Sequence, residues 1–269
     1  MIPYQSGQLG LSQARAAEGL YTDQGVFVPF SAVQLQTTFQ SSYDDVSSYV
    51  ATGAEVGTIT VIDPGAGPFG SGDLYNPNTA TFPYRQYVTF TRASQQGLGG
   101  ATEFTVEAWI KPEGGRGYIA RGIVGQYTAT INQQYLLYNN GITGSEISLS
   151  FTIRRSAGVV SSGIAAAGSG VTLGAWHHIR VTGKVNSGSG LLEIRWYVDG
   201  VYKTVTTHTS SPIVENPNTV LHQVGIMNVG TGSESRFPGW IGPIRVIKDY
   251  ALNSNTSNFA TPSTYFPVY

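Results

Sequence analysis

Aromatic and amide side chains gather between residues 127 and 140, and a sugar-binding surface is built from such groups. The rings can stack on the apolar face of a sugar, while amides and hydroxyls exchange hydrogen bonds with its hydroxyl groups. The candidate glycan-binding residues in this region are Tyr127, Tyr135, Tyr138, Asn139 and Asn140, with Gln133 and Gln134 beside them. The alternative interpretation is that they are ordinary side chains of loops and strand ends.

Trp109 is a further candidate glycan-binding residue, and it lies in the most regular stretch of the chain. Residues 104–112 alternate without a break, which predicts a strand with one apolar face. The apolar face consists of Phe104, Val106, Ala108 and Ile110. Glu107 and Trp109 fall on the opposite face. For these two residues we favour packing over function, with a neighbouring loop or the C-terminal tail covering Trp109.

Carboxylates that could hydrolyse a glycosidic bond do not occur at a suitable spacing. A retaining glycosidase holds two carboxyl groups about 5–5.5 Å apart, and a Glu-x-Asp-x-x-Glu run, which would place acids on one strand face, is absent. Glu193 is followed by Arg195, where a second acid would be needed. No serine or lysine lies in a recognisable nucleophile setting. The sequence therefore predicts a protein that is not an enzyme.

A bound calcium ion is the one cofactor for which the sequence offers ligands, and it needs six to eight oxygen atoms. The acids available in predicted loops are Asp44, Asp45, Asp63, Asp73 and Asp199. Several of them also suit turns or polar loops without a metal, so we expect no cofactor. His177 and His178 are adjacent and point to opposite faces of a strand, so they cannot chelate one metal together. We expect one to be half-buried and the other to face solvent.

The composition excludes several classes of protein. Charged residues make up 12% of the chain and the net charge is -1, so there is no basic stripe for binding nucleic acid. No apolar run reaches the roughly 18 residues of a transmembrane helix, and the N-terminus lacks the basic start and apolar core of a signal peptide. The chain has no cysteine and hence no disulfides, but its 269 residues can bury a sufficient core.

About twelve short strands at regular spacing predict an all-β, two-sheet antiparallel sandwich or jelly roll. The clearest local feature is a hairpin over residues 191–208, in which Asp199-Gly200 forms a type I′ turn. That turn predicts Val198 opposite Val201, Trp196 opposite Lys203 and Ile194 opposite Val205. Further along, Gly242-Pro243 separates Ile241 from Ile244 and predicts a bulge or bend.

Six motifs occur in an order that resembles one family. They are Phe69–Tyr75, Tyr87–Phe90, Phe104–Pro112, Trp176–Thr182, Trp196–Val201 and Phe237–Val246. Their order and spacing are similar to those of concanavalin-A-like jelly rolls of the laminin-G-like type, and the resemblance covers residues 31–252. It implies a jelly roll over this range, preceded by an extended N-terminal arm over residues 1–30 and followed by a C-terminal tail over residues 253–269. The arm contains a possible short helix over residues 11–18.

The segment Phe-Thr-Val-Glu-Ala-Trp at residues 104–109 occurs in a chain with no signal peptide and no cysteine. In this combination the sequence resembles domains of bacteriophage virion proteins, such as capsid decoration, head-fibre and tail-associated proteins. This resemblance implies a non-enzymatic structural or decoration protein located in the virion. Its N-terminal arm would bind other virion proteins or sister copies of the chain. The alternative is a carbohydrate-binding module or adhesin that recognises cell-surface glycans.

Overall fold

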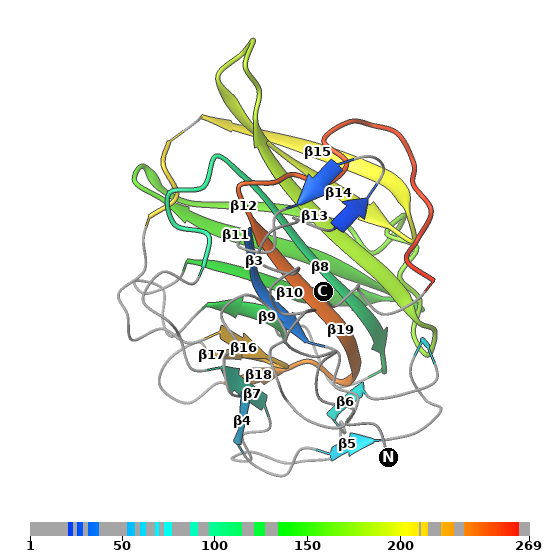
Figure 1. Ribbon diagram of the computed structural model, residues 1–269. Coiled ribbons are helices and arrows are strands. Elements are labelled where there is room, and N and C mark those ends of the chain that lie inside the picture. The colour runs from blue at the N-terminus through cyan, green and yellow to red at the C-terminus, as the bar shows by residue number, and fades with distance from the viewer. Residues whose placement is uncertain are drawn as a thin grey trace, which may run out of the picture.

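A computed structural model of the chain shows two β-sheets packed face to face (Figure 1). The structure describes residues 21–23, 26–28, 32–37, 53–56, 60–62, 68–69, 73–76, 87–90, 97–114, 121–126, 134–209, 211–214, 222–228 and 234–263. Several predictions concern residues outside these ranges: the helix over residues 11–18, and the site candidates Asp44, Asp45, Asp63 and Tyr127.

One sheet, named here the β11 sheet, has the strand order β12-β11-β10-β9-β16-β7-β4, with β18 joining it at β9 and β17 pairing with β18. Its strands are β4 (Gly53–Val56), β7 (Tyr87–Phe90), β9 (Arg121–Gln126), β10 (Tyr135–Thr143), β11 (Glu146–Arg155), β12 (Gly158–Ile164), β16 (His222–Val224), β17 (Ile226–Asn228) and β18 (Glu234–Arg236).

The facing sheet, named the β8 sheet, has the order β15-β14-β13-β8-β19-β6-β5, and β3 also pairs with β19. Its strands are β3 (Val33–Thr37), β5 (Thr60–Ile62), β6 (Asp73–Asn76), β8 (Glu103–Pro112), β13 (His177–Val185), β14 (Leu191–Val198), β15 (Val201–Thr209) and β19 (Gly239–Lys248). A separate two-stranded sheet is formed by β1 (Tyr21–Asp23) and β2 (Val26–Val28), which pair with each other. The all-β sandwich predicted from the strand spacing is confirmed.

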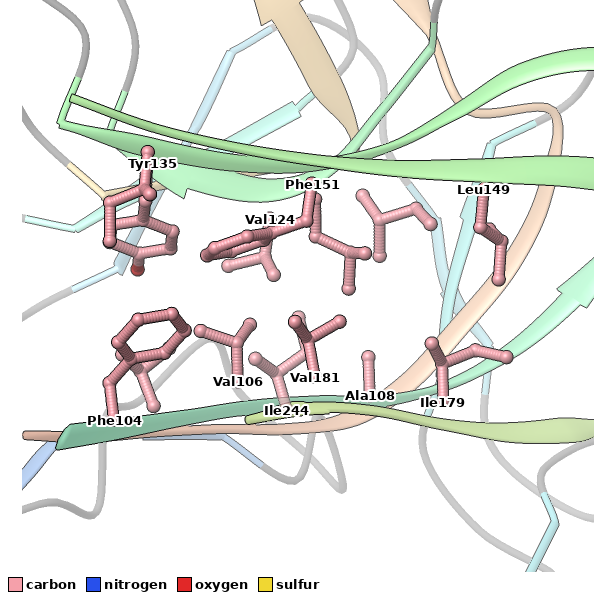
Figure 2. Close-up of a cluster of buried hydrophobic side chains, with 14 of the residues drawn as sticks. Phe104, Val106, Ala108, Val124, Tyr135, Leu149, Phe151, Ile179, Val181 and Ile244 are labelled. Atoms are coloured by element: carbon pink, nitrogen blue, oxygen red, sulfur yellow. The ribbon is translucent and has the colours of Figure 1, made fainter. Parts of the chain in front are cut away.

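The hydrophobic core lies between the two sheets and follows the alternation of their strands (Figure 2). From the β8 sheet, Phe104, Val106 and Ala108 point into it, and all three are fully buried. Leu149 and Phe151 of β11 meet them from the opposite sheet, and the Phe104 and Phe151 rings stack with centroids 5.4 Å apart. A strand with one apolar face needs such a covering sheet, so the inner face predicted for residues 104–110 is confirmed.

The hairpin of β14 and β15 forms with the expected turn but with a different register. Asp199 and Gly200 have φ angles of 51° and 75°, as a type I′ turn requires, and Val198 lies opposite Val201. The register then shifts, so the predicted pairs of Trp196 with Lys203 and of Ile194 with Val205 are wrong. Trp196 lies opposite Thr204, and Ile194 lies opposite Thr206. An extra residue on β15, opposite the step from Trp196 to Tyr197, causes this shift. Trp196 faces the core with Ile194 and Val198, and its indole N–H donates to Ser162 Oγ at 2.7 Å.

The irregularity predicted near Gly242-Pro243 is present in β19. Its pairing with β8 shifts between Ile241 and Ile244, and this bulge allows both residues to be fully buried although they are three positions apart. Beyond the bulge, Arg245 pairs with Glu107 of β8. The bulge therefore sets which side chains of β19 share the outer face of the sheet with Glu107.

Candidate functional site

The outer face of β10, β11 and β12 carries hydroxyl groups, one tyrosine and one arginine, and is named here the polar face. Its members are Tyr138, Ser148, Ser150, Thr152, Arg154 and Ser161. They face outward because Leu149, Phe151 and Ile153, the residues between them on β11, fill the core. Pairing brings Tyr138 opposite Ser150, and Thr152 opposite Ser161. Ser161 is exposed, and Tyr138 and Arg154 are half-buried.

The structure separates the glycan-binding candidates of residues 127–140. Tyr135 is fully buried in the core (Figure 2), and its hydroxyl is 2.8 Å from Nδ1 of His222. Asn139 is also buried, and its side-chain oxygen accepts a hydrogen bond from the Gly141 amide. Tyr138 is half-buried on the polar face and Asn140 is exposed at the adjacent bulge. Of the described candidates in this region, Tyr138 and Asn140 therefore remain accessible to a ligand.

The outer face of the β8 sheet holds a buried ionic cluster centred on Glu107. Arg180 of β13 donates from Nε to Glu107 Oε2 at 2.8 Å, and Arg245 of β19 donates from Nε to Oε1 at 2.6 Å. His178 Nε2 lies 3.2 Å from Oε2. The side chains of the two arginines, the histidine and the glutamate are all at most 1% exposed.

The charges of this cluster decide its chemistry. Burial raises the pKa of the Glu107 carboxyl, but Arg180, Arg245 and the His178 hydrogen bond more than offset this, so its pKa lies well below the ordinary 4.5. Burial lowers the pKa of His178, although Glu107 opposes that shift. A catalytic acid needs the opposite displacement, with its proton retained near neutral pH. Glu107 is therefore an ionised structural carboxylate held between two guanidinium groups.

The C-terminal segment, residues 249–263, covers this cluster from outside. The side-chain oxygen of Asn253 accepts a hydrogen bond from Arg180, and the Tyr197 hydroxyl donates to the backbone carbonyls of Asn253 and Asn255. The Phe259 ring lies over the Arg180 guanidinium, and the centroid of the ring is 4.0 Å from Arg180 Cζ. Stacking of this kind stabilises a desolvated cation, so the segment completes the burial of the cluster.

Trp109 lies on the same outer face, and its indole packs against neighbouring aromatic side chains. Its ring is 5.2 Å from that of Phe69 and 5.3 Å from that of His178. The indole is half-buried between these neighbours, while Glu107 beside it is fully buried. The packing interpretation favoured for both residues agrees with this arrangement, and neither forms part of an open platform.

Asp199 and the two adjacent histidines form a structural hydrogen-bond network at the β14–β15 turn. Asp199 Oδ2 is 2.7 Å from His177 Nδ1, and its Oδ1 accepts from the His178 amide at 2.8 Å. The Thr172 amide donates to His177 Nε2 at 3.0 Å, which places the ring proton on Nδ1. Both histidines are buried, so the expectation that one faces solvent is wrong: the C-terminal segment and the hairpin turn cover the two faces.

The proposed calcium ligands are not assembled within the part of the chain that the structure describes. Asp199 already binds His177 and His178, and Asp73 begins the strand β6, whereas a loop was expected there. Among the described residues there is no group of three or more His, Cys, Asp or Glu side chains that could hold a metal ion.

Arg180 and Arg245 are the residues of the outer face that the sequence analysis did not single out. Both lie directly opposite Glu107 in the strand pairing, one on each neighbouring strand. A basic residue at an outward position in each motif, beside a strand whose outward face carries acids, could have suggested the pair. The pairing itself, however, depends on the register of three strands.

Comparison with known proteins identifies a family over most of the sandwich. Residues 82–256 match the sequence profile described as the concanavalin A-like lectin/glucanases superfamily, of the laminin-G type. No curated protein matches the sequence. Within the described residues, no helix has the length and apolarity that a membrane crossing requires.

Solved structures share the fold at low sequence identity. A structure of botulinum neurotoxin type C, which depends on interaction with two ganglioside molecules to enter cells, is 13% identical with a TM-score of 0.58, over 82% of this chain and 49% of that one. Tailspike protein 2 of the Escherichia coli O157:H7 bacteriophage CAB120 is 10% identical with a TM-score of 0.51, over 75% of this chain and 26% of that one. The chain thus spans about half the length of the first and a quarter of the second, and both likenesses are likenesses of fold.

Proposed function

Because this chain belongs to the concanavalin A-like lectin/glucanase superfamily, we propose that it is a non-catalytic domain that binds glycans through its polar face. The observation that carries this proposal is the position of Tyr138, half-buried among hydroxyl side chains on the outer face of β10–β12. A tyrosine there offers an aromatic surface for a sugar ring, Ser150 lies opposite it on β11, and Ser161 and Arg154 further along the same face offer donors for sugar oxygens.

The sheet beneath the polar face supports the proposal because it holds these side chains on a rigid base. Leu149, Phe151 and Ile153 are fully buried directly behind them, and groups on a packed strand need little ordering when a ligand binds. The state of Glu107 supports a non-catalytic role, since its carboxylate is neutralised by Arg180 and Arg245 and cannot serve as a general acid.

A glycan array probed with the whole chain tests this function. Saturable binding to a defined glycan is expected, and Tyr138→Ala should weaken it at least about tenfold, since an aromatic anchor at an interface contributes more than about 1 kcal/mol. Tyr202→Ala is the matched control, because Tyr202 is a half-buried tyrosine on β15 of the opposite sheet. No binding on the array, or equal loss in both variants, would contradict the proposal.

A second candidate function is that of a structural or decoration protein of a virus particle, with the N-terminal arm as the attachment. The supporting observation is that β1 and β2 pair with each other in a sheet of their own, apart from both sheets of the sandwich. Partners would be other particle proteins or sister copies. Deleting residues 1–30 should leave a folded domain that no longer joins the particle. Normal assembly of the truncated chain would show that the arm is not the attachment.

A further inference from the structure

Arg155 ends β11 at one end of the sandwich, and its side chain is directed between the two sheets. It follows Phe151 and Ile153 in the alternation that fills the core, and it is 4% exposed. Its backbone pairs with Gly158 of β12 and forms a bridge to Ile213. The guanidinium Nε and Nη1 are buried and have no hydrogen-bond partner among the residues that the structure describes.

A guanidinium in this position carries an unbalanced charge. Arginine stays protonated in proteins, so it cannot become neutral to escape the cost of burial. The buried arginines of the outer face, Arg180 and Arg245, both bind the Glu107 carboxylate. Among the residues that the structure describes, no carboxylate forms an ion pair with Arg155, and its Nε and Nη1 have no hydrogen-bond partner there. Buried groups of this kind are normally satisfied by a partner, and here the described part of the chain supplies none.

Two further polar atoms without partners lie at the same end of the sandwich. His208 of β15 pairs with the buried Leu192, and its Nε2 is buried and unpartnered. Because His208 lies opposite Leu192, a residue of the core, its side chain is on the inner face of β15. Burial lowers the pKa of His208, and the positive charge of Arg155 lowers it further. Ser211 Oγ is likewise buried and unpartnered. Ser211 precedes Pro212, whose carbonyl accepts a hydrogen bond from the Ser156 amide at 2.9 Å.

We propose that Arg155, His208 and Ser211 form a binding site for an oxyanion, that is, a carboxylate, sulfate or phosphate group. Such a group supplies a negative charge to balance the positive charge of Arg155, and its oxygen atoms are hydrogen-bond acceptors. It can accept hydrogen bonds from the guanidinium, from the serine hydroxyl and from Nε2–H of a neutral histidine. The residues come from three segments, β11, β15 and the stretch 211–214, so they converge only in the folded chain. The site is separate from the polar face and does not depend on glycan binding there.

Anion-dependent stability and calorimetric titration of the whole chain test the proposal. At constant ionic strength, sulfate, phosphate or acetate should raise the Tm more than chloride does, because a ligand that binds only the folded state stabilises it. Arg155→Met should weaken anion binding at least about tenfold, since a hydrogen bond to a charged group contributes about 1.5–3 kcal/mol. Lys184→Gln is the control, because that cation lies on β13 of the other sheet with its side chain 42% exposed, and its loss should leave the affinity unchanged.

Further variants keep the test independent of the folding of Arg155→Met. Ser211→Ala and His208→Gln each change one hydroxyl or ring donor and should lower the affinity about three- to tenfold. Glucuronate and a sulfated oligosaccharide, titrated beside the inorganic ions, distinguish an acidic group carried on a sugar from a free ion. An anion response equal to that of chloride would overturn the proposal, as would a response that Arg155→Met and Ser211→Ala both retain. Greater stability of Arg155→Met with no anion dependence would overturn it as well.

Discussion

Replacing Glu107 by glutamine is the sharpest test of the physical account of the β8 sheet. The substitution keeps the shape of the side chain and removes its charge. It leaves Arg180 and Arg245 buried without a counter-ion, together with His178 beside them. Removing one partner of a buried ion pair costs about 3–5 kcal/mol, because the remaining charge stays desolvated. We therefore expect the free energy of unfolding to fall by about 3–5 kcal/mol near pH 7.

Urea denaturation and thermal unfolding give this difference directly. At about 2 °C per kcal/mol for a chain of this size, the Tm should fall by about 6–10 °C. Glu103→Gln is the matched control on the same strand. The Glu103 side chain is 29% exposed, and its salt bridge to Lys184 lies at the surface. A surface pair of this kind contributes at most about 1 kcal/mol, so the control should lower the Tm only slightly.

The pH dependence of the stability difference between the wild-type protein and Glu107→Gln shows whether the lost stability comes from the charge of Glu107 or from its packing. The pKa of Glu107 in the folded state lies below its ordinary value of 4.5, because the arginines and His178 outweigh the effect of burial. The stability contributed by the ionised carboxylate is therefore present above about pH 4.5 and is lost as the pH falls toward the folded-state pKa. The difference between the wild-type protein and Glu107→Gln should shrink over that range. An equal difference at pH 7 and pH 3 would refute the electrostatic explanation.

Three further substitutions or titrations follow from the packing. Phe259→Ala removes the ring that covers Arg180 at 4.0 Å, so backbone amides of the C-terminal segment should exchange hydrogen faster while those of β8 keep their protection. Burial raises the pKa of Tyr197 to about 12; its ultraviolet titration should lie above that of an exposed tyrosine, and the associated stability should be lost as the pH rises from about 10 to about 12. Gly183→Ala would place a Cβ 2.1 Å from the Phe104 ring, and the overpacking should lower the free energy of unfolding by about 1–3 kcal/mol, measured by urea denaturation.

Local patterns in the sequence were sufficient to predict those features that depend on interactions between residues close together in the chain. The alternation of residues 104–110 predicted β8 and its inner face, the Asp199-Gly200 pair predicted the turn, and Gly242-Pro243 predicted the bulge of β19. Each feature depends on the backbone preferences or side-chain order of adjacent residues. The order of motifs was likewise sufficient to indicate the family.

Local patterns failed where a single shifted residue reverses the facing of a strand. The register shift opposite Trp196 was not visible in the sequence, so its pairing with Lys203 was wrong. Tyr135 and Tyr138 of β10 are three positions apart, so alternation puts them on opposite faces: Tyr135 enters the core and Tyr138 faces outward. The packing of the sheet on its partner decided which of the two faces inward.

The sequence by itself determined the sandwich, its family and the absence of a glycosidase motif, because these depend on periodicity and on residue order. The tertiary structure decided the state of the charged residues. Glu107 lies 73 positions from Arg180 and 138 positions from Arg245, and whether these charges neutralise one another depends on the register of three strands. The same is true of Arg155, whose buried Nε and Nη1 differ from those of the other two in finding no partner among the described residues. Burial and distance set the energy of a charge, and both arise only when the sheets pack.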